Sequence, residues 1–370
     1  MTGRADREPV KEPASFGGQG IGSGGPIRAS IVIVSYNAKE KLHQCLASVT
    51  RSISECEVIV IDNASKGGVV DDLQEHFPGV LLLRNKANVG FGAAGNLGAG
   101  YARGEYLIFL NQDTLVKRGW VEGLLAPFED DDRTGLVTSK VLLLDQPERI
   151  NACGNTVHYT GLTICRGLNF PRDSFNEVEE VDAVSGAAFA IRRELFELLE
   201  GFDEDTFLYM EDTDLSLRAR LAGWRCIYTP HSIVLHDYSL RIAGLKVFYQ
   251  ERNRYLMLLK NLAWPTLIVL LPALVLAEII TWGFVLLNDR SNIGNKIRAC
   301  RWILSNWKRV MERRRAAQAL RRVSDRELLR HTTFKLEFGD VDNRFGRFAN
   351  VLFNPIFFLL RSAASMLIWW

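Results

Sequence analysis

The chain has 370 residues, of which 47% are hydrophobic and 24% are charged, so a wholly disordered or fibrous protein is excluded. The 45 basic and 43 acidic residues leave a formal charge of +2, which argues against a general nucleic-acid-binding protein. The charge is unevenly distributed along the chain. Residues 289–335 contain 14 Lys or Arg and 4 Asp or Glu, which leaves the first 288 residues net acidic.

The N-terminal segment, residues 1–28, is rich in Gly, Pro and charged residues and lacks the apolar segment of a secretory signal. We expect it to be disordered. The six cysteines form no CxxC pair and no cluster with histidine. This pattern predicts neither a disulfide framework nor a structural zinc site, and it favours a reducing compartment.

Short apolar runs alternate with helical segments in the first third of the chain. Strands are predicted at residues 31–34, 58–61, 80–83 and 106–110, and helices at 40–49 and 91–102. This order is typical of βαβ units. It predicts a doubly wound, mostly parallel, Rossmann-like α/β sheet.

The alternation becomes irregular beyond Trp120. Strands are expected at 136–144, 157–164, 181–191, 226–228 and 233–236, with helices after Arg193 and at 214–222. Gly223 is a typical helix terminator, and Asp214 is the expected cap at the other end of the same helix.

Polar side chains follow each of the first four predicted strands. They are Ser35, Tyr36 and Asn37; Asp62 and Asn63; Arg84 and Asn85; and Asn111, Gln112 and Asp113. Ligands bind at the carboxyl ends of the strands in open parallel sheets. Asn and Asp also favour turns because they hydrogen-bond their own backbone. Four such sets in register nevertheless favour a binding site.

The sequence contains no phosphate-binding loop of the GxxxxGK[ST] type, and no GxGxxG motif follows the first strand. A glycine-rich turn at residues 90–92 precedes Gly95 and Gly98. These glycines either let a ligand approach the backbone or allow a helix to pack tightly on the sheet.

Two acidic positions suit catalysis. Asp113 follows an apolar strand, and a carboxylate there suits Mg²⁺, which takes one or two protein carboxylates with substrate phosphates. Glu211 and Asp212 follow the apolar segment 207–210, which can raise the pKa of a carboxylate toward that of a general base. Carboxylates at a helix start also complement its dipole. His236, at the end of a predicted strand, is either a ligand or a buried structural histidine.

Together these segments resemble the inverting glycosyltransferases of family 2, which have the GT-A fold, and are most similar to their rhamnosyltransferase-like branch. The resemblance covers residues 29–260. It rests on six motifs in order: IVIVSYN at 31–37, VIDNAS at 60–65, NVGFGAAGN at 88–96, FLNQDT at 109–114, SGA at 185–187 and YMEDTDLSLR at 209–218.

The resemblance implies roles for the site residues. The nucleotide sugar would be bound by Ser35, Tyr36, Asn37, Asp62, Asn63, Asn88, Gly90, Phe91, Asn96, Asn111 and Gln112. Asp62 would contact the base, and Asn111-Gln112-Asp113 takes the place of the DxD motif. Asp113, with His236, would hold Mg²⁺ or Mn²⁺. Asp212 would be the catalytic base, with Glu211 beside it. Asn111 departs from the family pattern because it supplies no charge.

The implied reaction moves a sugar, with rhamnose suggested, from a dTDP-, UDP- or GDP-sugar to a hydroxyl of a lipid-linked or cell-surface glycan. One alternative is a polyprenyl-phosphate glycosyl synthase or a polysaccharide synthase, although no QxxRW-like motif is present. The other is a membrane-bound scaffold that binds nucleotide sugars without catalysis, which the neutral Asn111 keeps open.

Residues 261–370 form a tail of different composition. Residues 262–287 contain one charged residue, Glu278, and the basic segment 289–335 separates them from a second apolar stretch at 348–370. One helix through 262–287 would be about 39 Å long, enough to span a bilayer. A single span would place the basic segment outside, against the positive-inside tendency. A buried helix of a soluble domain is a third interpretation.

Charge therefore favours a re-entrant or interfacial insertion over a span. We expect a membrane-associated helical tail at the cytoplasmic face of the cell membrane, with basic residues toward anionic lipid headgroups. A solvated helix face is the alternative for the arginine clusters at 313–315 and 321–322. Nucleic acid is not an expected partner.

Overall fold

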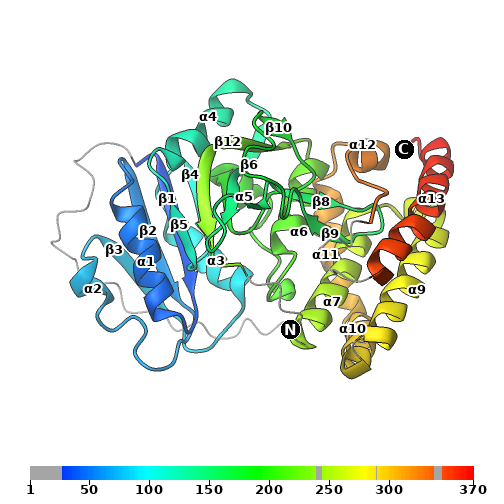
Figure 1. Cartoon of the computed structure of the whole chain (residues 1–370), viewed down its shortest axis with the longest axis horizontal. Helices are drawn as coiled ribbons and strands as arrows, with labels where there is room; N and C mark the ends of the chain where they lie inside the picture. Colours follow the sequence, from blue (N-terminus) through cyan, green and yellow to red (C-terminus); the bar gives the residue numbers. More distant parts are fainter. Residues whose placement is uncertain (1–26, 239–243, 289, 337–343) are drawn as a thin grey trace.

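A computed structural model describes residues 27–238, 244–288, 290–336 and 344–370 (Figure 1). The segment predicted to be disordered lies outside these residues, except for Ile27 and Arg28. A sheet with covering helices comes first along the chain. A layer of helices follows, beginning at α7 (Gly244–Asn261), which lies against the sheet domain.

The core is a ten-stranded sheet in which β10, β12, β6, β11, β4, β1, β2 and β3 lie side by side in this order. The strands are β1 Ala29–Ser35, β2 Cys56–Asp62, β3 Val80–Arg84, β4 Tyr106–Leu110, β5 Thr114–Val116, β6 Thr134–Leu143, β7 Ile150–Ala152, β10 Glu179–Glu180, β11 Ala188–Arg192 and β12 Arg225–His236. β1 to β4 are parallel, and β11 runs antiparallel to both its neighbours. The predicted mostly parallel α/β sheet is confirmed.

Helices cover both faces of this sheet. They are α1 Lys39–Thr50, α2 Leu73–His76, α3 Phe91–Tyr101, α4 Trp120–Asp130, α5 Arg193–Leu198 and α6 Glu211–Leu221. Alternate residues of β1 divide between the faces, as the pleat of a strand requires. Ile31 belongs to the core cluster that includes residues of α1 and α4, whereas Val32 belongs to the cluster that includes residues of α3, α5 and α6.

The irregular middle of the chain differs from the expected strands. Residues 157–164 form no single strand, because β8 (Asn155–Val157) turns back into β9 (Thr163–Cys165) as an antiparallel pair. Of residues 181–191, only those from Ala188 onward form a strand. The two short strands expected at 226–228 and 233–236 are one strand, β12, with an irregularity between Thr229 and Ile233.

The expected capping role of Asp214 is wrong. α6 begins at Glu211, because Met210 adopts a left-handed conformation (φ 65°) that ends the preceding loop. Asp214 therefore lies inside the helix, where it is buried and paired with Arg218 and Lys260. Gly223, with φ of 88°, follows the helix as expected.

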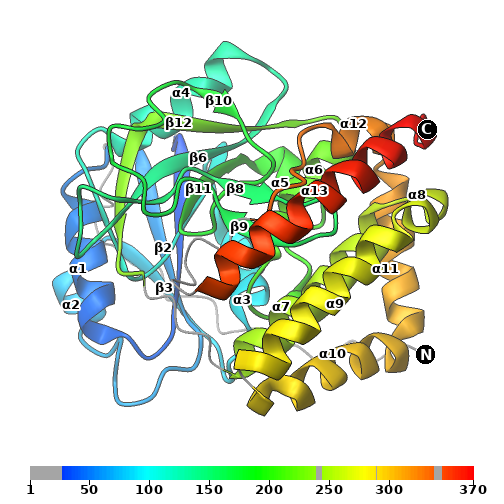
Figure 2. The same ribbon diagram turned by 45° about the vertical axis from the view of Figure 1, so that its right-hand side comes forward.

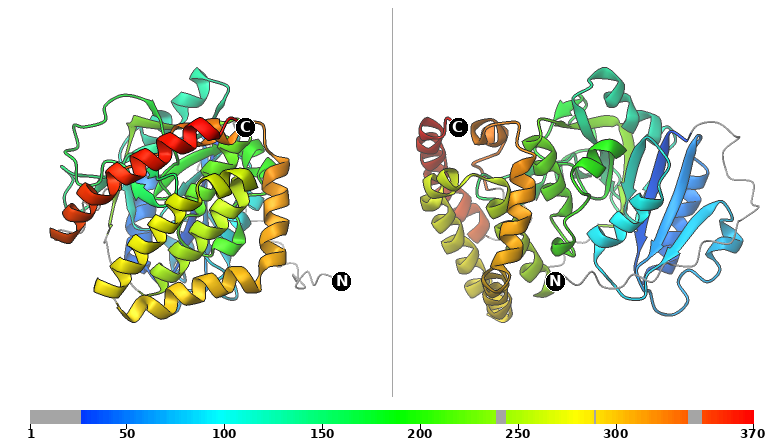
Figure 3. Two further views of the ribbon diagram at one scale, coloured as in Figure 1. Left: turned by 90° about the vertical axis from the view of Figure 1, so that its right-hand side faces the viewer. Right: turned by 180° about the vertical axis from the view of Figure 1, so that it is seen from behind.

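The C-terminal helices form a second layer. They are α7, α8 Trp264–Val269, α9 Leu271–Asn288, α10 Ile293–Ser305, α11 Trp307–Ala319, α12 Asp325–Arg330 and α13 Arg344–Leu367. Figure 2 shows α9 and α13 side by side, on the side of α7 that is remote from β1 to β4. α10 and α11 pack against α7, and together with α9 and α13 they form the outer surface of this layer (Figure 3).

Residues 262–287 do not form the single long helix considered above. The chain breaks between α8 and α9 at Leu270, which is buried. Ala273 and Ala277 pack in the same core cluster as Phe357 of α13. The opposite side of α9 is exposed. Among the described residues, one stretch is long and apolar enough to cross a membrane, Asn350–Leu367 of α13, and 11% of it is buried.

The basic segment 289–335 does not face outward as a whole. Nζ of the buried Lys296 lies 3.1 Å from Oε2 of Glu251. Arg314 is buried and donates to the carbonyl oxygen of Leu262 at 2.5 Å. The expectation that basic residues face lipid headgroups is wrong for Lys296 and Arg314, and the solvated-face alternative is wrong for Arg314, because both cations contact acidic groups or carbonyl oxygens of the protein.

Candidate active site

The carboxyl ends of β1, β2 and β4 meet at one edge of the sheet, as predicted. The backbone N–H of Tyr36 donates to Oε1 of Gln112 at 3.0 Å, and Nε2 of Gln112 donates back to the Tyr36 carbonyl oxygen at 3.2 Å. Ser35 is buried, and Tyr36 is 41% exposed. The segments after β1 and β4 are thus linked directly, and the exposed Tyr36 ring remains open to a ligand.

Asn63 connects three of the predicted binding segments. Its Oδ1 accepts from Asn85 Nδ2 at 3.0 Å and from the Val89 N–H at 3.1 Å, and its Nδ2 donates to Asn88 Oδ1 at 2.9 Å. Asp62 Oδ1 accepts from the Ser65 N–H at 3.0 Å. Asn63 and Asp62 therefore form turns, as one of the two interpretations expected, and these turns shape the edge of the sheet where the strands end.

A second turn at this edge is built by Asn37, which follows β1. The Asn37 N–H donates to Ser65 Oγ at 2.9 Å, and its Oδ1 accepts from the Lys66 N–H at 2.8 Å. The loops after β1 and β2 are therefore held together by side-chain bonds.

The glycine-rich turn and Asn96 pack the fold together. Gly90 has φ of 86°, and a Cβ atom there would lie 2.4 Å from the Phe207 carbonyl oxygen. The same oxygen accepts from the Phe91 N–H at 2.7 Å. Asn96 uses both ends of its amide on the backbone of Phe202. Of the two interpretations of these glycines, close packing accounts for Gly90.

Asp113 and His236 approach each other at the end of β12. Nε2 of His236 lies 3.4 Å from Oδ1 of Asp113, while Nδ1 of His236 lies 2.8 Å from Oδ1 of Asn151. An amide oxygen is an acceptor, so Nδ1 donates to it, and Nε2 is directed at Asp113.

This pair fits a divalent cation. A carboxylate oxygen and an imidazole nitrogen facing each other are both electron donors, and Mn²⁺ accepts both types of ligand. Among the described residues, no group of three or more His, Cys, Asp or Glu could hold a metal ion. The protein would therefore supply two ligands, and the diphosphate of a donor and water would supply the others.

A cavity of about 400 Å³ connects this end of the sheet with the start of α6. The predicted residues that line it are Phe91, Asn111, Glu211, Asp212 and His236. The β8–β9 hairpin contributes Leu162 and Thr163, and α7 contributes Lys246 and Gln250. Ser35 to Asn37, Asp62 and Asn63 do not line this cavity. They belong to the adjacent strand ends, so the predicted site has two neighbouring parts.

Asp212 is fixed by donors from three elements. Its Oδ2 accepts from the Gly186 N–H at 2.7 Å and from Asn155 Nδ2 at 3.0 Å. Its Oδ1 accepts from the N–H of Thr213 at 2.6 Å and from the Thr213 hydroxyl at 3.2 Å. Hydrogen bonds of this kind favour the ionised carboxylate. Burial outweighs them, so the pKa of Asp212 still lies above its ordinary value.

Glu211 has the opposite environment. It is buried, and its Oε2 has no hydrogen-bond partner. Burial, with a smaller contribution from the Asp212 charge, raises the pKa of Glu211 to about 8. At neutral pH Glu211 is therefore mainly protonated beside Asp212. The apolar segment before α6 thus has the expected effect on both carboxyl groups.

Three residues of this site were given no individual role in the sequence-based prediction, although Gly186 lies in the SGA motif at 185–187. Asn151 fixes the His236 ring, Asn155 holds Asp212, and Gly186 brings its N–H to Asp212. A Cβ atom on Gly186 would lie 3.1 Å from Asp212 Oδ2. Asn151 and Asn155 lie four residues apart in an otherwise apolar stretch, which could have marked them as candidates. Their partners, His236 and Asp212, are distant in sequence and could not be read from that pattern.

The sequence is similar to those of known glycosyltransferases. Residues 30–199 match the model of glycosyl transferase family 2. The N-acetylglucosaminyl-diphospho-decaprenol L-rhamnosyltransferase of Mycobacterium tuberculosis is 29% identical over 231 residues, or 56% of this chain and 75% of that protein. Rhamnosyltransferase WbbL of Escherichia coli is 24% identical over 221 residues, or 56% of this chain and 82% of that protein.

Solved structures share the fold. The structure of GalNAc-T7 with UDP, GalNAc and Mn²⁺ has a TM-score of 0.53 at 22% identity and covers 64% of this chain, which spans 48% of that one. The structure of S. aureus TarS 1–349 with UDP-GlcNAc has a TM-score of 0.53 at 15% identity and covers 92% of this chain and 88% of that one. The latter likeness extends beyond β12 into the helical layer.

The sheet and its helices define a protein of the GT-A class. The matched domain and the curated relatives place it further: residues 30–199 form a glycosyl transferase family 2 domain, and the chain is a glycosyltransferase.

Proposed function

We propose that this enzyme moves a sugar, with inversion, from a nucleoside diphosphate sugar to a hydroxyl of a lipid-linked or cell-surface glycan. The observation that carries the proposal is one cavity lined by Asp212 at one end and by Asn111 and His236 at the other. A single displacement at an anomeric carbon needs a general base on one side of the sugar and a site for the leaving diphosphate on the other, and this cavity has a candidate for each.

At the donor end, His236 and the neighbouring Asp113 would hold Mg²⁺ or Mn²⁺. When bound, the cation would neutralise the charge that develops on the leaving diphosphate. Asn151 orients His236 for this purpose. Asn111 supplies hydrogen bonds to the donor without charge, and the turns of Tyr36 and Asp62 receive the nucleoside.

At the other end, Asp212 takes the proton of the acceptor hydroxyl. The Thr213 hydroxyl is the longest of its four contacts, at 3.2 Å, and is the donor that an acceptor hydroxyl can replace. The protonated Glu211 places no second negative charge next to Asp212. Pairs of carboxyl groups with different environments commonly divide acid and base work in this way.

A rhamnosyl donor such as dTDP-rhamnose is the proposed substrate, because two matched relatives are named rhamnosyltransferases. The name of the mycobacterial relative specifies a sugar on a polyprenyl diphosphate as acceptor. We propose the same chemical class of acceptor here.

The proposed location is the cytoplasmic face of the cell membrane. In the outer helical layer, large apolar side chains are exposed on α9 and α13: Val275, Ile279, Leu286, Leu287, Val351, Leu352, Phe358 and Leu359. We call this set the α9–α13 face. An exposed apolar surface of this kind suits insertion into one leaflet from one side.

A donor panel tests the function. The full chain is incubated with Mn²⁺, an N-acetylglucosaminyl polyprenyl diphosphate and dTDP-rhamnose, UDP-GlcNAc or GDP-mannose. We expect transfer from dTDP-rhamnose with inverted configuration. Transfer to polyprenyl phosphate would instead indicate a lipid-sugar synthase, and donor binding without turnover would indicate a scaffold.

A further inference from the structure

The loop that leads into Glu211 and Asp212 has an unusual backbone. Within residues 203–210, here called the base loop, Phe207, Tyr209 and Met210 have φ of 58°, 67° and 65°. Residues other than glycine rarely adopt such φ values, and these conformations persist only where contacts with the surrounding structure stabilise them. The contacts that hold this loop therefore decide where the two carboxyl groups lie.

Asn253 of α7 holds the carbonyl groups of the base loop. Its Nδ2 lies within hydrogen-bond distance of the carbonyl oxygens of Thr206 (2.9 Å), Leu208 (3.0 Å) and Tyr209 (2.7 Å). The adjacent Arg252 donates to the Thr206 oxygen at 2.7 Å. Asn253 is 1% exposed, so water does not compete for these bonds.

α7 also contacts Asp214, which follows the carboxyl pair Glu211 and Asp212 in the chain. Lys260 lies seven residues after Asn253, two turns along one face of α7. Its Nζ contacts Asp214 Oδ1 at 2.8 Å and forms an ion pair with Asp203 at the start of the base loop. Glu211 and Asp212 thus lie between two segments that are both fixed to α7.

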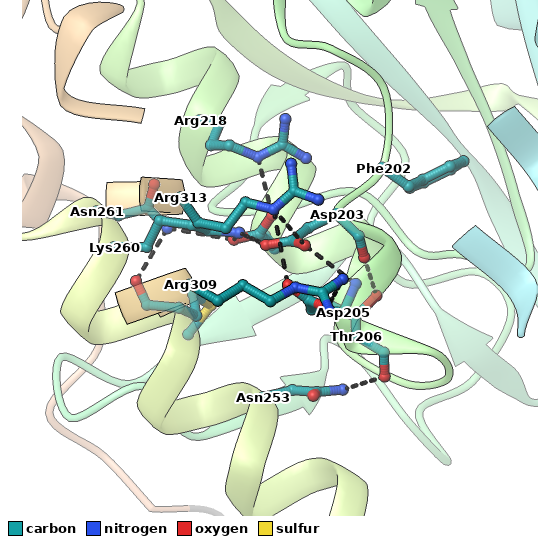
Figure 4. Close-up of polar contacts among 12 residues, drawn as sticks. Phe202, Asp203, Asp205, Thr206, Arg218, Asn253, Lys260, Asn261, Arg309 and Arg313 are labelled. Carbon is teal, nitrogen blue, oxygen red and sulfur yellow. Dashed lines mark hydrogen bonds and ion pairs between the residues drawn. The ribbon is translucent and has the colours of Figure 1, made fainter. Parts of the chain in front are cut away.

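α11 completes this arrangement from the basic segment (Figure 4). Arg309 Nη2 lies 2.5 Å from Asp205 Oδ1, and Arg313 Nε lies 3.6 Å from Asp203 Oδ1 and from Asp205 Oδ2. The two arginines are four residues apart and share one face of the helix. Burial and the Asp203 charge raise the pKa of Asp205, whereas Arg309 and Arg313 act in the opposite direction and favour its ionised form.

We propose that α7 and α11 are positioning elements of the active site: Asn253, Lys260, Arg309 and Arg313 hold the base loop so that Asp212 faces the acceptor. None of the four lines the cavity. They are therefore positioning residues and touch no substrate. The inference rests on the proposed function of Asp212 and gives the C-terminal helices a part in turnover besides any contact with lipid.

The arginines are the best test, because Arg309 is half-exposed and its replacement leaves the core intact. We expect the double variant Arg309→Gln/Arg313→Gln to lower kcat by about 10- to 100-fold through misplacement of the base, with the donor KM changed less than about twofold. Arg309→Lys/Arg313→Lys retains both cations and should recover most of kcat. Arg315→Gln is the control, since Arg315 is exposed on α11 and has no ion pair among the described residues.

A second measurement reads the loop itself. Amide hydrogen exchange of residues 207–212 in the ligand-free full chain should become at least about tenfold faster in Asn253→Ala and in the double Gln variant, and stay unchanged in Arg315→Gln. Unchanged exchange would overturn the inference even if wild-type transfer were never found. Unchanged kcat in an active enzyme, or an equal loss in Arg315→Gln, would also overturn it. Absence of wild-type transfer with every donor would count against the proposed function alone.

Discussion

Nε2 of His236 lies 3.4 Å from Oδ1 of Asp113, although the two residues belong to β12 and to the turn after β4. β5, which follows Asp113, pairs with the end of β12 and brings His236 opposite Thr114. The sheet itself thus brings together the two proposed metal ligands, of which His236 lines the cavity.

The first prediction concerns the metal. Asp113→Asn removes the charged ligand, so Mn²⁺-dependent transfer should fall at least about 100-fold, and Mn²⁺ should no longer strengthen the binding of the donor nucleotide measured by calorimetry. Asn151→Ala frees the His236 ring and should weaken Mn²⁺ binding about 10-fold. Metal-strengthened nucleotide binding in Asp113→Asn would exclude this assignment.

The second prediction concerns the base. Asp212→Asn should lower kcat about 10²- to 10⁴-fold, the usual contribution of a general base, with donor affinity unchanged. Asp145→Asn, in an exposed loop, is the matched control and should keep full activity. A variant of Asp212 with near-normal kcat would show that another group accepts the proton.

The third prediction concerns pH and stability. The pKa of Glu211 is about 8 in the folded protein because of burial, against 4.5 as its ordinary value. The folded state therefore binds more protons than the unfolded state between these values, and stability contributed by Glu211 is lost as pH rises through this range.

Glu211→Gln removes this titration. Its melting temperature relative to wild type should therefore rise from pH 5 to pH 8, as followed by circular dichroism. Parallel melting curves for the two proteins across this range would contradict the burial of a protonated Glu211.

Much of the sheet was predictable because of its burial. β1 and β4 are covered on both faces, so their sequences are uninterrupted apolar runs that stand out from the surrounding helices. The polar residues that follow the parallel strands, such as Asn63 after β2 and Asp113 after β4, were predicted from the same topology. The start of α6 was misplaced because it depends on the left-handed Met210, a conformation imposed by packing.

The base-loop contacts could not be predicted for a different reason. Asn253 bonds to carbonyl groups 44 to 47 residues earlier in the chain, and no local pattern encodes such a pairing. The same holds for Arg309 and Asp205. The composition alone showed that the first 288 residues are net acidic and that residues 289–335 are basic. Only the structure shows that some of these opposite charges pair with each other inside the molecule.

The fourth prediction concerns the membrane. Leu359→Glu places a charge in the α9–α13 face, where Leu359 is 65% exposed. Removing one inserted leucine should weaken binding to anionic liposomes at least about tenfold in a sedimentation assay. Val178→Glu, at an exposed valine of the sheet domain, is the control and should bind as wild type. Equal binding by the two variants would exclude the α9–α13 face as the contact.

The fifth prediction concerns Gly90. A Cβ atom at this position would lie 2.4 Å from the carbonyl oxygen and 2.7 Å from the Cα of Phe207, both backbone atoms, and the φ of 86° adds strain. Gly90→Ala should therefore lower the free energy of unfolding by about 2 kcal/mol or more, measured by urea denaturation, and displace the base loop, which lowers kcat.

Gly100→Ala supplies the control for this change. Gly100 lies in α3 with no atom within 4 Å of a new Cβ, so alanine there should stabilise the protein by about 0.5 to 1 kcal/mol. Opposite signs for two Gly-to-Ala changes ten residues apart would separate the contact with Phe207 from the general effect of losing a glycine. If Gly90→Ala unfolded at the wild-type urea concentration, the close packing of the turn on the base loop would be wrong.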